Sequence, residues 1–562
     1  MFSFSARHIE SNNGARRGTL NPARFYELAS DTVHKQLRKC DDGPPPLSLL
    51  QTLIITTFYE LVSCVQRVAW RLLGALIRIA YELRLHLVDL PSRPTLNNEN
   101  PEPVEKWIAK EERRRAWWAI WEFEVFVTTI RRCPLGIHPS QHTTLLPVDD
   151  ALWFKGQKSP SCFLEADPAL RWKELQNSGN DSGKAWFIVI NSLMRDAHCL
   201  SNPSVPSRPC AQDEDRHYRN TNSEDRQQIN PDSEISLQLA ILDNCVSCFS
   251  IALPQRLRYR SELLFAPSTT STESTTQRRD SDKITIHVMI QLAKIMILHK
   301  DCFRNDSQAL DQQLPEQYDY NNTSAAAELP TNSDRTAATS SAVWSRYLHA
   351  AENVVSSVRN ASPDILSYGH PLLVNTFWMV AAIQIVQKTF AKTRSEKLVA
   401  QSNFDLLRLT IMQHGDYWSS PAVRIQNLER LESTLSAIRA RMLSGKHTKK
   451  DRLNTTAHPP EEEIVSYSNS INTRSHEYSS CTIQNDNKQL ESTQSVQQAD
   501  AFSPESVFSF NNDEVTGTAS ANYSAMDFTI DFPMDTIFSE IWEQSQQNEL
   551  YIASDPGAFN SF

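Results

Sequence analysis

Two stretches decide the fold: residues 67–87 read RVAWRLLGALIRIAYELRLHL, and residues 111–153 read EERRRAWWAIWEFEVFVTTIRRCPLGIHPSQHTTLLPVDDALW. In the first stretch the polar residues recur every three or four positions and therefore share one helical face. These residues are Arg67, Arg71, Gly74, Arg78 and Glu82. Almost all other positions are apolar, so the pattern predicts a helix that is mostly buried.

The second stretch is rich in tryptophan and charge. Trp107, Trp117, Trp118 and Trp121 lie beside five consecutive charged residues, 111–115. Glu/Arg pairs three or four residues apart can brace one face of a helix. The flanking glutamates and tryptophans fit a structural helix better than a patch that binds nucleic acid. We therefore interpret the tryptophans as core residues and the charges as helix bracing.

Composition indicates an all-α fold. The 562 residues include 29 Pro but only 13 Gly, which disfavours glycine-rich nucleotide-binding folds and turn-rich β architectures. No stretch has a convincing strand pattern. Residues 1–22 are polar and expected to be frayed; a first helix begins near Asn21 and ends at Pro44–Pro46. Further helices are expected at 47–66, 184–200, 234–260, 284–303, 341–359, 371–391, 402–415 and 420–444.

The chain divides into four parts by composition. A short segment, 1–44, precedes a large helical regulatory domain, 45–444, with polar inserts near 201–232 and 304–340. Residues 445–500 are polar with almost no core-forming side chains, which predicts a disordered linker. Residues 501–562 hold ten acidic residues and no Lys, Arg or His, so the net charge of −10 is a property of this tail.

The acidic tail also carries apolar side chains at helical spacing. If the segment became helical they would form one face, comprising Met534, Ile537, Phe538, Ile541 and Trp542. Acidic residues with such a face are typical of a disordered activation segment that folds into a groove on a partner. The alternative is an unstructured, solubilising tail.

A small basic cluster stands where the helical domain gives way to the linker. It comprises Lys446, Lys449, Lys450 and Arg452, together with His447. An accessible basic run of this kind can be a nuclear import signal or simply a solubilising surface run.

The cysteines and histidines give no metal or disulfide pattern. Ten cysteines are scattered, as expected for a reduced intracellular protein, and Cys245 and Cys248 form a C-x-x-C inside an apolar helix, where packing is the better interpretation. Isolated histidines, among them His299, are interpreted as structural. We find no signal peptide and no uncharged apolar run of the roughly 18 residues that span a bilayer, so no membrane is expected.

One acidic pair raises the alternative of an enzyme. Asp149 and Asp150 could hold Mg²⁺ for phosphate chemistry on a helical scaffold. No second acidic cluster, glycine-rich phosphate loop or G-x-S-x-G elbow accompanies them. We therefore expect no enzyme activity and no cofactor in this chain.

The ordered motifs resemble a known family, the fungal-specific transcription factor domain, which is the middle homology region of fungal Zn₂Cys₆ regulators. The resemblance covers about residues 45–444 and is densest over 67–154. It rests on AWRLLGALIRIAYELRLH, EERRRAWWAIWEFEVFV, PLGI and LLPVDDALW, followed by ALPQRLR, IHVMIQLAKIMILHKD and YWSSPAVRIQNLERL. It implies an all-helical protein that acts in the nucleus, often as a dimer, and regulates transcription of metabolic genes.

The family's usual DNA reader, a basic six-cysteine cluster that binds two zinc ions, is absent from this sequence, whose first cysteine is Cys40. Two explanations stay open: DNA contact comes from a partner, or the gene model has lost its first exons. Zinc is expected only if a missing cluster exists, and direct DNA contact is not supported by this chain alone.

The resulting hypothesis is a nuclear transcriptional regulator, an activator of a metabolic or biosynthetic gene set, secondary metabolism included. Its tail recruits coactivators, while the helical domain restrains the tail, forms a homodimer or meets a DNA-binding partner. The alternatives are a scaffold and a helical protein that senses a small metabolite in a tryptophan-lined interior.

Overall fold

The computed structural model describes residues 2–12, 21–40, 43–63, 65, 67–90, 102–138, 142–201, 231–266, 273–303, 332–420 and 422–454. Residues up to Met442 belong to one compact unit. A second unit begins at Leu443, and the end of the last helix is the part of it that is described.

Helices make up nearly all the regular secondary structure of the described residues, which confirms the expected fold class. The first part of the chain forms α1 (Phe2–Asn12), α2 (Pro22–Leu37), α3 (Leu47–Ser63), α4 (Arg67–Glu82), η1 (Leu85–Leu87), α5 (Val104–Arg131), α6 (Asp150–Phe154), α7 (Pro168–Ser178) and α8 (Gly183–Ser201). The second part forms α9 (Pro231–Ala252), η3 (Gln255–Leu257), α10 (Glu273–Cys302), α12 (Asn332–Arg359), α13 (Ile365–Tyr368), η4 (Pro371–Leu373), α14 (Val374–Phe390), α15 (Arg394–Trp418) and α16 (Val423–Asn454). Among these residues, β pairing is limited to one isolated parallel bridge between Leu264 and Ala361.

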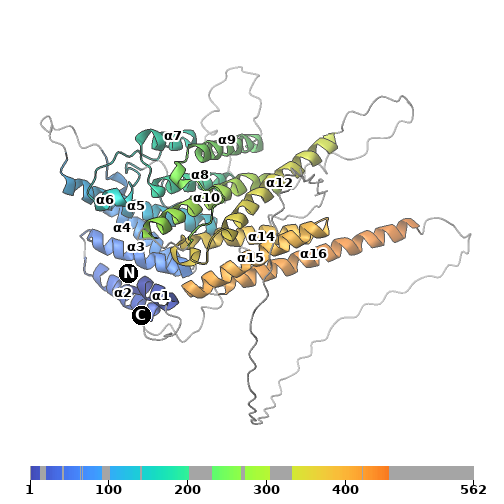
Figure 1. The fold of residues 1–562 in the computed structure, drawn as a ribbon, viewed down its shortest axis with the longest axis horizontal. Helices are drawn as coiled ribbons and strands as arrows, with labels where there is room; N and C mark the ends of the chain where they lie inside the picture. The colour runs from blue at the N-terminus through green and yellow to red at the C-terminus, as the bar shows by residue number, and fades with distance from the viewer. Residues whose placement is uncertain are drawn as a thin grey trace, which may run out of the picture. The chain divides into compact units, whose positions relative to one another are not determined.

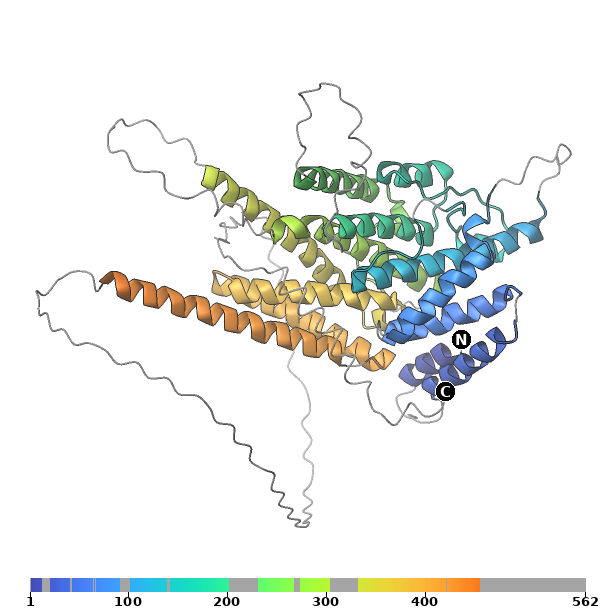
Figure 2. The same cartoon turned by 180° about the vertical axis from the view of Figure 1, so that it is seen from behind.

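The helices of the first unit pack in neighbouring groups (Figures 1 and 2). At the centre, α10 lies between α8 and α12, with α9 packed on α8 and α10. The hairpin of α14 and α15 packs on α12, and α16 contributes Leu428, Leu431 and Leu435 to the same core. At the N-terminal side, α1 to α4 pack in succession, and α5 joins α3 and α4 to α8. Helix α5 therefore connects the two groups, and α1 and α3 also contact α15.

The N-terminal helix α1 corrects an expectation, because residues 1–22 were predicted to be frayed. Arg7 donates hydrogen bonds to the Tyr59 hydroxyl (2.9 Å), the Tyr417 carbonyl (3.1 Å) and Ser419 Oγ (3.0 Å). Phe4 stacks on Phe58 with ring centroids 5.8 Å apart. The composition of this segment does not favour a stable helix. Contacts with residues far away in the sequence stabilise it instead. Asn21, in contrast, caps α2 as predicted, accepting from the Ala23 and Arg24 amides.

The helix pattern of the opening stretch is confirmed. On α4 the stripe residues Arg67, Arg71, Arg78 and Glu82 are exposed, while Leu73 and Leu76 on the opposite side are fully buried. On α5, Trp117 and Trp118 are fully buried and Trp107 and Trp121 nearly so. The Trp118 indole N–H donates to the Leu145 carbonyl at 2.8 Å. The tryptophans are core residues, as interpreted.

The charged run of α5 does more than brace its own helix. Glu111 is fully buried and accepts from Arg114 (3.2 Å), Arg115 (3.1 Å) and the Val148 backbone amide (2.9 Å). Arg114 also forms a two-point ion pair with Asp89, at 2.8 and 2.5 Å. The pairs three and four residues apart are confirmed, and the same groups fix the turn after α4 and the extended segment that reaches Val148.

The segment Ser233–Ala252 of α9 is long and apolar enough to cross a membrane, judged by length and composition alone. It contains Glu234 and Asp243, and it packs against α7, α8 and α10. We interpret it as a helix of the fold.

Replacing Arg114 by Leu is expected to lower the free energy of unfolding by about 3–5 kcal/mol, because Asp89 and Glu111 lose the guanidinium that compensates their buried charge. The measurement is urea denaturation of the full chain. Arg24→Ala is the matched control, since Arg24 also pairs with a glutamate three residues away, but in an exposed position. Its effect should stay below about 1 kcal/mol. Equal losses of unfolding free energy in the two variants would contradict the conclusion that the buried ion pairs of Arg114 stabilise the fold.

Candidate functional site

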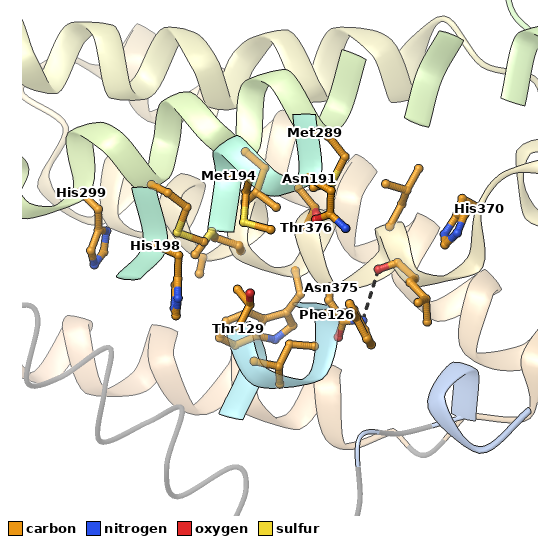
Figure 3. A pocket seen from close by; sticks show the side chains of 18 of the residues that line it. Phe126, Thr129, Asn191, Met194, His198, Met289, His299, His370, Asn375 and Thr376 are labelled. Carbon is orange, nitrogen blue, oxygen red and sulfur yellow. Dashed lines mark hydrogen bonds between the residues drawn. The ribbon is translucent and has the colours of Figure 1, made fainter. Parts of the chain in front are cut away.

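The main candidate site is a cavity of about 140 Å³ inside the helical unit. Its walls come from α5, α8, α10, α12, η4 and α14, so it lies where the N-terminal and central helices meet. Figure 3 shows His198 and His299 at one end and His370 at the other, with Asn191, Met194 and Thr376 between them. Side chains from six elements thus converge on one interior space.

The cavity surface is mainly apolar. Its larger side chains are four methionines and four aromatic residues: Met194, Met289, Met296, Met379, Phe126, Phe187, Tyr347 and Trp378. Thioether side chains adapt to irregular shapes and make favourable contacts with aromatic rings. Such a surface favours an apolar, ring-shaped occupant.

Polar side chains without a partner interrupt this apolar surface. Asn191, His198 and Thr376 are only 3%, 7% and 6% exposed, and none forms a hydrogen bond within the described residues. The Thr129 hydroxyl is likewise buried and has no partner there. Buried polar groups in folded proteins nearly always have partners. Among the described residues, buried polar atoms without a partner also occur elsewhere in the core, for example at Thr57 and His287. The convergence of four polar side chains on one mainly apolar interior space is what distinguishes this site.

Electrostatics at the His198 end disfavour a charged imidazole. Burial, reinforced by the nearby charges of Arg132 and Arg195, lowers the pKa of His198 to about 3. The ring is therefore neutral at physiological pH, with one nitrogen able to donate a hydrogen bond and the other able to accept one. The neighbouring His299 lies with its Nδ1 3.1 Å from the Tyr347 hydroxyl.

A buried ion pair stands at the opposite end. Glu122, 3% exposed, accepts a hydrogen bond from His370 Nε2 at 2.8 Å and pairs with Lys184. Burial alone would raise the pKa of Glu122, but Lys184 and His370 outweigh it and lower the pKa to about 2. Because a carboxylate only accepts, the His370 Nε2 must carry the proton. The Glu122 carboxylate therefore already has a hydrogen-bond partner and an ion-pair partner within the protein.

The alternative of a sensing site lined by the four tryptophans is not what the structure has. Trp107, Trp117, Trp118 and Trp121 do not line this cavity, and Trp378 is the tryptophan that does. The sequence suggested the helices that carry the lining, but His299 was interpreted only as structural. No local spacing signals the convergence, because the lining comes from residues 122 to 383.

The acidic pair has a structural explanation. Asp149 caps α6 by accepting from the Ala151 amide at 2.9 Å, and it pairs with Arg256 at 3.2 Å. Asp150 pairs with Arg115 and Arg278. In the part of the chain that the structure describes, no group of three potential metal-ligating side chains is found. Arg115, Arg256 and Arg278 therefore pair with the two aspartates. Burial, together with the nearby charges of Asp149 and Asp150, raises the pKa of Asp282 on α10 to about 6.

The other sequence-derived candidates fall partly outside the described residues. Cys245 is buried, and Cys248 donates to Asn244 Oδ1 at 3.7 Å within α9, so packing explains this pair. The basic residues 446–452 lie within the backbone bounds of α16, and their side chains are not described. The activation face, Met534 to Trp542, lies outside the described residues.

Replacing Glu122 by Gln is expected to destabilise the protein by about 3 kcal/mol at neutral pH, in line with the lowered pKa. Because the folded pKa lies below the ordinary value of 4.5, this stabilisation is fully present above about pH 4.5 and disappears as the pH falls towards 2. The measurement is the free energy of unfolding of both proteins between pH 3 and 7. Glu429→Gln, in an exposed pair with Arg408, should have little effect at any pH. A pH-independent loss for Glu122→Gln would contradict this ionic role.

Several known proteins resemble part of this chain. The chain is similar to the pigment biosynthesis transcriptional activator pigB of Monascus ruber, with 28% identity over 118 residues that cover 21% of each chain. It is also similar to the citrinin biosynthesis transcriptional activator mrl3 of the same organism, with 26% identity over 141 residues, 25% of this chain and 26% of the relative. A third relative is the tropolone cluster transcription factor tropK of Talaromyces stipitatus, with 28% identity over 125 residues, 22% of this chain and 21% of the relative.

These alignments span about a fifth to a quarter of each curated relative. No solved structure matches the chain.

The sequence profile described as "Fungal specific transcription factor domain" matches residues 5–291. This match covers just over half of the chain and includes α4, α5, α8 and most of α10. It begins before the expected boundary at residue 45 and ends before 444, so those domain boundaries stay predictions. The profile match shows that this chain belongs to the fungal-specific transcription factor domain family.

Proposed function

We propose that this protein is a transcriptional regulator that acts in a fungal nucleus and controls a metabolic or biosynthetic gene set. The observation that carries the proposal is the family match over residues 5–291. Relatives named as activators of pigment and citrinin biosynthesis support the kind of gene set. On this proposal the helical unit is a regulatory domain rather than a catalytic one.

The proposed mechanism is recruitment by the acidic tail. Residues 501–562 combine ten acidic residues with aromatic side chains and contain no cation. We propose that the face around Phe538 and Trp542 becomes helical when it enters an apolar groove on a coactivator. The regulatory domain, 45–444, would restrain the tail until a signal shifts the balance between restrained and free states.

We propose that DNA contact is made with help from a second copy of the chain or a DNA-binding partner. The acidic tail is unsuited to contact DNA, since phosphate binding needs Lys and Arg to replace counterions. We assign no residue of this chain to base reading and no zinc to its described part. The basic residues Lys446, Lys449, Lys450 and Arg452 would serve nuclear import.

The cavity supports a sensing role within the same function. Four polar side chains around a mainly apolar interior space fit a site for a small molecule better than a scaffold surface. A ligand that binds one state of the domain better than the other would shift the regulator between those states.

The recruitment mechanism is tested by fusing the full chain, and separately residues 501–562, to a heterologous DNA-binding module upstream of a reporter gene. The tail alone should activate strongly. Phe538→Ala with Trp542→Ala should reduce the output several-fold, because the apolar face is lost. Phe508→Ala with Phe510→Ala is the matched control, with two aromatics removed from the same tail outside that face.

Output from the tail no higher than from the bare DNA-binding module would remove the tail from the mechanism. Equal losses in the two double variants would show that general aromatic content, rather than this face, recruits the coactivator. Full-chain output below that of the tail alone would support restraint by the helical domain.

A further inference from the structure

We infer that the cavity between α5, α8, α10 and α14 binds a small, neutral, hydroxylated aromatic molecule of about one ring. Binding itself is a property of the helical unit. Its role as an effector rests on the proposed function in transcription.

The volume sets the size of the ligand. The cavity measures about 140 Å³. An engineered apolar protein cavity of ~150 Å³ holds benzene, so this space accommodates a single ring with a small substituent.

The apolar surface sets the character of the ring. Met194 and Met289 bring thioether groups into the cavity, and Phe126, Phe187 and Trp378 add aromatic surface. Sulfur–aromatic contacts and aromatic pairs favour a planar unsaturated ring over a saturated polar one. An aromatic ligand would therefore gain specific contacts in addition to burial.

The polar groups of the lining favour a ligand that forms hydrogen bonds. The Asn191 side chain offers two hydrogen-bond donors and an acceptor, and the residue is only 3% exposed. Thr129, Thr376 and His198 add further donor and acceptor atoms around the same space. One ligand hydroxyl can both donate and accept, so it can satisfy two of these groups at once.

The charges favour a neutral ligand. Two charged side chains line the cavity, Glu122 and Arg132. Glu122 is compensated by Lys184 and His370, and Arg132 has interactions of its own, so neither is left without a partner. The His198 imidazole is neutral, because burial and the nearby charge of Arg132 disfavour its protonation. An anionic ligand would have to lose its hydration in a mainly apolar space, which is costly unless it is fully paired. A phenol avoids that cost.

The test uses the purified full chain and isothermal titration with three probes that share one methyl-substituted ring: p-cresol, toluene and 4-methylbenzoate. In a purely apolar cavity the hydroxyl would be a penalty, because it would lose its hydrogen bonds to water. Here p-cresol is expected to bind about fivefold more tightly than toluene, as one net hydrogen bond would give. The carboxylate probe should not bind at the same concentrations.

Two variants test the polar groups. Thr129→Val and Asn191→Leu keep similar volumes and should each weaken p-cresol binding about fivefold, with little effect on toluene. Thr57→Val is the matched control: its hydroxyl is also buried and unpartnered within the described residues, but Thr57 does not line the cavity. It should leave both affinities unchanged.

A third variant tests the location. Ala382→Leu places extra methyl groups at the cavity wall and should abolish binding of both neutral probes. Its thermal unfolding without ligand shows whether the variant is folded. If it is not, the Thr129 and Asn191 variants still decide the location, because only a ligand inside this cavity would respond to both.

Three results would overturn the inference: no binding of either neutral probe, tighter binding of 4-methylbenzoate than of p-cresol, or unchanged p-cresol affinity in both polar variants. A reporter driven by the full chain separates binding from function. If p-cresol binds but reporter output does not respond, the effector role fails while the site stands. Failure of the tail fusion to activate would instead count against the proposed recruitment.

Discussion

Three buried glutamates on α5 impose the constraint on which the rest of the structure depends. Glu111, Glu122 and Glu124 are each at most 3% exposed, and a carboxyl group cannot be buried so deeply without hydrogen-bond partners. The partners come from three different parts of the chain. Glu111 accepts from Val148 and two arginines, Glu122 from Lys184 and His370, and Glu124 from the Gly136 amide. Burying α5 therefore requires the loop after it, α8 and the segment before η4 to be in place.

The same helix links the structural network to the candidate site. Its N-terminal half carries the network of Glu111 and Arg114, and its C-terminal half carries Phe126 and Thr129 in the cavity wall. Glu122 stands between them and belongs to both, because its partner His370 also lines the cavity. A change in how the cavity is filled would act directly on helices that α5 holds together. This arrangement gives a physical route from an occupied cavity to the packing of the whole unit.

Much of the fold could be predicted from the sequence, and the reasons are local. The polar stripe of α4 and the Asn21-Pro22 start of α2 follow from side-chain periodicity and capping chemistry, which involve only neighbouring residues. The prediction failed for α1, whose stability depends on Arg7 meeting Tyr59 and Tyr417. It also missed α7 (Pro168–Ser178), whose short sequence is polar on most sides. These elements are stabilised by contacts that lie far away along the chain.

The sequence by itself determined the helical class, the family and the acidic character of the tail, because each depends on composition or on ordered local motifs. Only the tertiary structure decided what the charged and polar residues do. It placed Asp149 and Asp150 among arginines, which explains them as structural ion pairs. It also formed the candidate site, a cavity that joins Thr129, Asn191 and Thr376 from three helices. Periodicity specifies which face of a helix is buried, but which faces meet depends on the packing of the entire chain.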